Sequence, residues 1–230
     1  MKKELSISLT GLTNAQLAVL PDTMARINEI LFDIRRNKGV KVSYHIDIMD
    51  GQYVGNIQFC QMMLRQITQL CAQPMDFHLM TQNFYPYAHI IDDVCKNSLS
   101  AVYKITTHLD TNTTVTVQSE QTNRFGIAVN PDEAVPSSLL SSVNHVVLMT
   151  VCPGKGGQQF INQESKLDFL YNYRAKNNLD YTIVVDGGIN VDTVEHVKLA
   201  DTIVVGSYFT RALADNRAEY AIDKLLENWL

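Results

Sequence analysis

The stretch H-I-D-I-M-D-G at residues 45–51 places side chains that could bind a metal ion inside a pattern that predicts a buried strand. Residues 42–48 are mostly β-branched, aromatic or apolar, and a turn signal follows them. Side chains alternate along a strand, so His45, Asp47 and Met49 share one face, with His45 and Asp47 about 6.6 Å apart. Burying an imidazole and a carboxylate costs free energy unless something pairs them. The stretch therefore indicates either a satisfied His–Asp pair or a metal site.

Two later strand patterns end in the same kinds of group. In D-F-H-L-M at residues 76–80, His78 and Met80 share a face, and Asp186 directly follows another strand pattern. Two histidines and two aspartates at the same end of a sheet make a donor set suited to zinc or another first-row divalent ion. We expect His108, after a further strand, to support such a site or to be structural.

Three glycine-containing loops follow the last three strand patterns. They are P-G-K-G-G-Q at residues 153–158, D-G-G at 186–188 and V-G-S at 205–207. Glycine allows the backbone to approach a ligand closely, and a short helical pattern follows the third loop. In barrels of alternating strands and helices, loops near the seventh and eighth strands and a short helix N-terminus often bind phosphate. The loops therefore predict a phosphate cradle.

The elements that would position these groups alternate along the chain. Strands are expected at residues 5–9, 42–48, 75–79, 101–105, 126–129, 145–149, 181–185 and 202–205. Helices are expected at 14–38, 59–73, 85–96, 164–176 and 191–199, with short pieces after Pro131 and from 208 onward; a helix at 112–123 is doubtful on propensity. Eight apolar strands alternating with helices predict an α/β fold, a single (β/α)8 TIM barrel over residues 1–230. Active sites of such barrels lie at the C-terminal strand ends.

The composition excludes several classes of function. The chain has 230 residues, 46% of them hydrophobic, and a net charge of −5, which argues against a nucleic-acid partner. There is no signal-peptide pattern and no apolar run long enough to cross a membrane, so we expect a soluble cytoplasmic protein. The four cysteines show no metal-binding or disulfide spacing, and we do not expect Cys152 to be a nucleophile, because the sequence shows no base that would activate it.

Five strings together resemble the ribulose-phosphate 3-epimerase family. They are H-I-D-I-M-D-G (45–51), D-F-H-L-M (76–80), M-T-V-C-P-G-K-G-G-Q-Q-F (149–160), V-D-G-G-I (185–189) and V-G-S (205–207), and they occur in family order. The resemblance implies an isomerase with a ribulose-phosphate-binding barrel, a phosphorylated ketose as substrate and an oligomeric assembly, expected here to be a homo-oligomer.

The resemblance also implies roles for particular residues. His45, Asp47, His78 and Asp186 would hold a divalent metal, most simply zinc, with iron(II), manganese or cobalt as alternatives. Asp47 and Asp186 would exchange protons with the substrate. Substrate and phosphate contacts would come from Ser8, His78, Gly154, Lys155, Gly156, Gly157, Gly187, Gly188, Gly206 and Ser207. Met49, Met80 and Met149 would line the pocket, although filling the core explains their pattern equally well.

Three hypotheses about function remain open at this point. The first is inversion of carbon 3 of D-ribulose 5-phosphate to give D-xylulose 5-phosphate through a cis-enediolate. The second is the same chemistry on a longer sugar such as D-allulose 6-phosphate, because the chain departs from the family pattern after Gly51 and at Cys152 and Lys155. The third is a degenerate barrel that binds a sugar phosphate without turnover, which the intact pair of acid–base carboxylates argues against.

Overall fold

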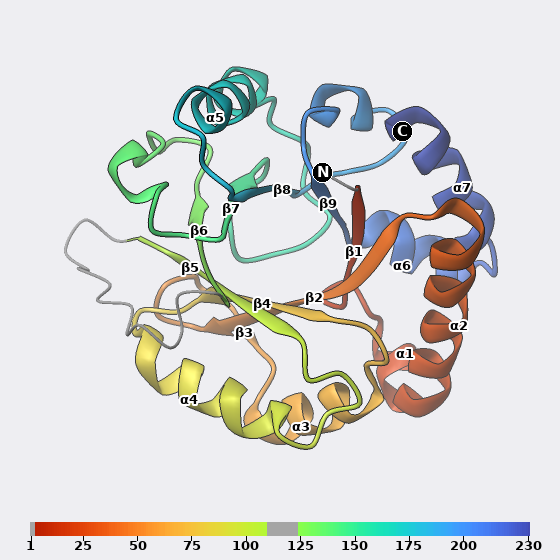
Figure 1. Ribbon diagram of the computed structural model, residues 1–230. Helices are drawn as coiled ribbons and strands as arrows, with labels where there is room; N and C mark the ends of the chain where they lie inside the picture. The colour runs from red at the N-terminus through yellow and green to blue at the C-terminus, as the bar shows by residue number, and fades with distance from the viewer. Residues whose placement is uncertain (1–2, 110–123) are drawn as a thin grey trace.

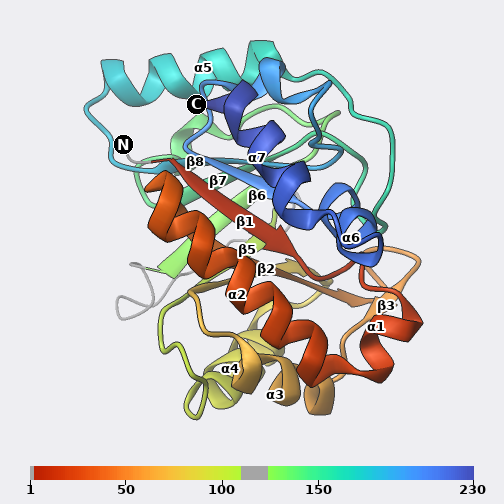
Figure 2. The same cartoon turned by 90° about the vertical axis from the view of Figure 1, so that its right-hand side faces the viewer.

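The computed structural model describes residues 3–109 and 124–230, and eight of its strands form a closed parallel barrel (Figures 1 and 2). The barrel strands are β1 (Glu4–Ser8), β2 (Lys41–Asp50), β4 (Met75–Met80), β5 (Tyr103–His108), β6 (Phe125–Val129), β7 (His145–Met149), β8 (Thr182–Asp186) and β9 (Thr202–Val205). Strand β1 pairs in parallel with both β2 and β9, which closes the sheet. The fold is therefore the predicted (β/α)8 TIM barrel.

Helices surround the barrel on its outer side (Figure 1). They are α1 (Asn14–Ala18), α2 (Leu20–Lys38), α3 (Gln61–Leu70), α4 (Phe84–Cys95), α5 (Glu164–Lys176), α6 (Ser207–Ala214) and α7 (Ala218–Trp229), with 3₁₀ turns η2 (Ser137–Leu139) and η3 (Val194–Val197). None of the helices in the described ranges is both long and apolar enough to cross a bilayer.

The alternation of side chains along each strand separates two buried regions. Outward-facing residues such as Ile46 and Ile48 join the large apolar cluster between strands and helices. Inward-facing positions near the C-terminal strand ends carry the polar groups, together with a small apolar cluster that includes Met149 and Val184. The registers place Asp47 of β2 opposite His78 of β4. Because alternate side chains of a strand point to opposite faces, the polar groups of the site point into the barrel and the aliphatic side chains pack on its outside.

Several expected boundaries were wrong for local reasons. The helix expected at 14–38 is two helices, because Pro21 can occupy only the first turn of α2 and the chain breaks at Val19. The last residue of β5 is His108, whereas the sequence pattern predicts the end of this strand at residue 105. A two-residue antiparallel strand, β3 (Ile57–Gln58), pairs with the end of β2 and was not expected.

The remaining differences concern the shorter helices. The segment expected as a helix at 191–199 contains only the turn η3, and the segment after Pro131 contains only η2. The chain after β9 instead forms two true helices, of which α7 has 12 residues and buries Trp229. The doubtful helix at 112–123 lies outside the described residues.

Candidate active site

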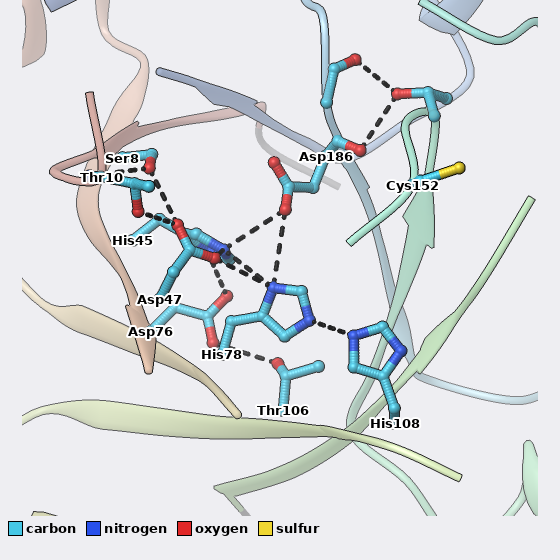
Figure 3. A network of polar contacts seen from close by, with 12 residues as sticks. Ser8, Thr10, His45, Asp47, Asp76, His78, Thr106, His108, Cys152 and Asp186 are labelled. Atoms are coloured by element: carbon cyan, nitrogen blue, oxygen red, sulfur yellow. Dashed lines mark hydrogen bonds and ion pairs between the residues drawn. The ribbon is translucent and has the colours of Figure 1, made fainter. Parts of the chain in front are cut away.

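Four side chains from three strands meet at the C-terminal end of the barrel (Figure 3). His45 and Asp47 come from β2, His78 from β4 and Asp186 from the end of β8. Asp47 Oδ1 lies 3.2 Å from both His45 Nε2 and His78 Nδ1, and Asp186 Oδ2 lies 3.5 Å and 3.6 Å from the same nitrogens. One nitrogen or oxygen of each residue lies within 4.8 Å of all the others. The structure therefore brings together the four residues that the sequence singled out.

The geometry of this group fits a divalent cation. Ligand bonds of about 2.0–2.2 Å in tetrahedral geometry hold donor atoms roughly 3.3–3.6 Å apart. The four carboxylate–imidazole distances fall in or near that range, and the two facing imidazole nitrogens, His45 Nε2 and His78 Nδ1, are 3.3 Å apart. Both rings are fully buried. Two imidazole nitrogens and two carboxylates at this spacing form a donor set that a metal ion can bridge.

The charges in the group are mutually dependent. Burial alone would raise the pKa of Asp47, but the adjacent His45 and His78 hold it well below its usual value. Burial would likewise raise the pKa of Asp186, and His45 lowers it instead. Burial favours neutral His45, whereas Asp47 and Asp186 raise its pKa well above the ordinary value. Both carboxylates therefore stay ionised only because positive charge is close to them.

Each imidazole also contacts a buried residue behind the group. Asp76 Oδ2 lies 3.4 Å from His45 Nδ1, and Asp76 Oδ1 accepts a hydrogen bond from Thr106 at 3.2 Å. His78 Nε2 lies 2.8 Å from His108 Nε2, and the planes of the two rings differ by 22°. Burial lowers the pKa of His108 to about 2, so its ring is neutral and its Nε2 can accept a hydrogen bond from His78 Nε2–H. Partners of this kind fix ring orientation and tautomer at metal sites.

Two hydroxyl groups hold the remaining oxygen of Asp47. Ser8 Oγ donates to Asp47 Oδ2 at 3.1 Å, and Thr10 Oγ1 donates to the same oxygen. Ser8 was expected at the site as a substrate contact, whereas Thr10 was missed. It lies beyond the end of β1 in the sequence, where strand periodicity gives no direction for its side chain.

A pocket opens directly above the four-residue group. Its walls include every glycine of the three predicted loops, together with Ser8, Lys155, Ser207 and the methionines Met49, Met80 and Met149. It is also lined by two of the departures from the family pattern, Cys152 and Lys155. Of the expected substrate contacts, His78 does not line the pocket, because its side chain is completely buried beneath it.

Glycine is required at two consecutive positions of this pocket. Gly187 has φ +121°, and an added Cβ would lie 2.5 Å from Val151. Gly188 has φ +65°, and its Cβ would lie 3.0 Å from the backbone of Phe160. Any other residue would strain the backbone and push the loops apart. The second loop therefore packs closely against the segment that carries the first loop because it contains glycine, and backbone groups rather than side chains form that wall.

Comparison with known proteins agrees with this geometry. The chain has 29% identity over 199 residues to the ribulose-phosphate 3-epimerase of Encephalitozoon cuniculi (85% of this chain, 87% of that protein) and 30% over 198 residues to that of Bacillus subtilis (83% and 88%). A mutant tryptophan synthase α-subunit from Pyrococcus furiosus shares the fold, with 14% identity, a TM-score of 0.55 and coverage of 99% and 97%. The model of the ribulose-phosphate 3 epimerase family matches residues 16–210, and the chain belongs to this family.

Proposed function

We propose that this chain inverts carbon 3 of D-ribulose 5-phosphate to give D-xylulose 5-phosphate. As a family member it is an isomerase-class enzyme that acts on carbohydrates. The observation that supports the specific reaction is the convergence of two ionised carboxylates on two buried imidazoles at the floor of a glycine-lined pocket. A binder without turnover has no need for two such carboxylates.

Inversion next to a carbonyl requires a base on one face of the substrate and an acid on the other. Asp47 and Asp186 come from β2 and β8, and two strands, β1 and β9, lie between these along the barrel wall. The two carboxylates therefore approach the pocket from different directions. We assign Asp47 as the proton acceptor and Asp186 as the proton donor in one direction, with the roles exchanged in reverse. The planar intermediate between the two transfers is a cis-enediolate.

The two carboxylates differ in their hydrogen bonds. Asp47 Oδ2 is held by the hydroxyl groups of Ser8 and Thr10, which fix its position and reduce its basicity. Asp186 has a side chain that is 15% exposed, compared with 8% for Asp47. The backbone carbonyls of Asp186 and Gly187 accept hydrogen bonds from Thr150 Oγ1 at 3.1 Å and 2.6 Å, which anchors the strand end.

We assign His45, Asp47, His78 and Asp186 as the ligands of a divalent metal ion. When bound there, such an ion supplies Lewis-acid charge that favours loss of the substrate proton and negative charge on the substrate oxygens. Met49, Met80 and Met149 cover the pocket wall with polarizable thioethers that keep water from the reacting carbon. The glycine loops and the N-terminus of α6 at Ser207 would hold the substrate phosphate.

A turnover assay with two substrates tests the reaction. Purified protein, supplied in turn with zinc, iron(II), manganese and cobalt, is given D-ribulose 5-phosphate or D-allulose 6-phosphate, and the products are separated by chromatography. Faster conversion of the pentulose phosphate supports the proposal. Faster conversion of the hexulose phosphate would favour the alternative, whose support is that Cys152 and Lys155 line the pocket. Absence of turnover on both would leave only the degenerate barrel.

Three further properties of the protein remain predictions from the sequence. They are the single domain over residues 1–230, the cytoplasmic location and the homo-oligomeric assembly. Size-exclusion chromatography with light scattering measures the last of these.

A further inference from the structure

A second groove runs beside the phosphate end of the pocket. Both share Gly157, Gly188 and Ser207 as walls. The groove continues along α6 and α7, and its charged residues are Asp192, Arg211, Asp215, Arg217 and Lys224. It is therefore continuous with the glycine loops. The groove is lined by three cationic side chains, whereas Lys155 is the one cationic side chain among the described residues that line the pocket.

The three cations of the groove differ in their partners. Arg217 Nη2 pairs with Asp215 Oδ2 at 2.8 Å, and Lys224 Nζ pairs with Glu227 Oε2 at 2.7 Å. Within residues 3–109 and 124–230, Arg211 makes neither an ion pair nor a side-chain hydrogen bond. Its charge is therefore available to a ligand, whereas the other two are already compensated.

The Arg211 guanidinium lies against the first glycine loop. A Cβ built on Gly157 would be 3.4 Å from Arg211 Nη2, and, apart from Gly157 and its two chain neighbours, no other atom of the described residues lies within 4 Å of that position. Gly157 has φ +72° and no side chain, so the guanidinium can lie directly against the backbone of the loop. Arg211 is also four residues after Ser207, which places both on the same side of α6, one turn apart.

We propose that Arg211 is a phosphate-recognition residue that closes the outer side of the glycine cradle. This inference rests on the proposed function, because it identifies Arg211 as the cationic side chain that binds the phosphate group of the proposed substrate. Backbone N–H groups alone can hold phosphate, but a guanidinium adds charge-assisted, bidentate hydrogen bonds. In a chain with net charge −5, a cation beside the cradle also offsets repulsion of the incoming phosphate.

The test compares Arg211→Gln, Arg211→Lys and the matched control Arg217→Gln, which removes a neighbouring arginine of the same groove that already has a partner. We expect Arg211→Gln to raise KM for the phosphorylated ketose roughly tenfold with little change in kcat, the effect of one exposed charge-assisted hydrogen bond. Arg211→Lys should recover part of the loss. Arg217→Gln should leave both constants unchanged. Added salt should raise KM more in the unsubstituted protein than in Arg211→Gln.

A second measurement does not depend on turnover. Inorganic phosphate should raise the melting temperature of the unsubstituted protein and of Arg217→Gln, and should do so less for Arg211→Gln. Equal KM values and equal phosphate-induced shifts in Arg211→Gln and the unsubstituted protein would overturn the assignment of Arg211. If the unsubstituted protein epimerises no ketose phosphate, the proposed function fails, and the phosphate titration alone still decides whether Arg211 binds the anion.

Discussion

Replacing Asp76 with asparagine should weaken metal binding at the proposed metal site while leaving the barrel folded. Asp76 lies on β4 and is 6% exposed. Its Oδ2 is 3.4 Å from His45 Nδ1, on the side of the ring opposite the four-residue group. Burial would raise the pKa of Asp76, but His45 holds it well below the ordinary value, so the residue is an anion. Asparagine keeps the shape of the side chain and removes this charge.

The expected size of the effect follows from the contact. Hydrogen bonds to charged groups contribute about 1.5–3 kcal/mol. A separation of 3.4 Å is longer than a well-formed hydrogen bond, so the lower figure of about 1.5 kcal/mol applies. That is roughly a tenfold loss of metal affinity, at the lower end of the roughly 10–100-fold effects of outer contacts at metal sites.

The assay is a zinc competition titration against a chromophoric chelator, made with the unsubstituted protein, Asp76→Asn and Asp201→Asn. Asp201 is also buried, but it precedes β9 at the other end of the barrel and pairs with Arg174. Asp201→Asn should lower the free energy of unfolding by about 3 kcal/mol without changing zinc affinity. If Asp76→Asn binds zinc as tightly as the unsubstituted protein, Asp76 does not support the ligand His45 and the reasoning fails.

The other predictions concern catalysis, cofactor, pH and packing. Asp186→Asn should lower kcat at least about a hundredfold with little change in melting temperature; near-full turnover would remove Asp186 from the catalytic pair. Dialysis against a chelator should abolish turnover and added divalent metal should restore it, whereas activity in a metal-free assay would refute metal dependence. Burial lowers the pKa of His145 from 6.5 to about 4, so between these pH values the unfolded chain binds a proton that the folded chain does not bind. The free energy of unfolding should therefore fall as the pH is lowered from 6.5 to 4. His145→Gln should reduce the pH dependence of this free energy, measured by urea unfolding, by the equivalent of about one proton. Gly126→Ala would place a Cβ 2.2 Å from the His145 ring and should cost about 1–3 kcal/mol of unfolding free energy; an unchanged denaturation midpoint would contradict this.

Much of the fold follows from local pattern. Strand periodicity correctly placed His45, Asp47 and Met49 on one face, because the alternation of side chains is a property of the extended backbone itself. In the structure this face points into the barrel, and Ile46 and Ile48 pack on its outside. The eight apolar runs likewise predicted the strands, since strands covered on both faces contain few polar residues. Boundaries were less accurate where one residue decides them, as Pro21 does for the start of α2.

The sequence by itself determined the barrel, the two histidines and two aspartates of the site, and the glycine loops, because each is encoded in periodicity or in a residue type at a strand end. Only the tertiary structure decided which residues support them. Thr10 on Asp47, Asp76 on His45, and Arg211 beside Gly157 are contacts between segments far apart in the chain. Closure of the barrel brings these segments together, and no local pattern specifies which side chains then meet.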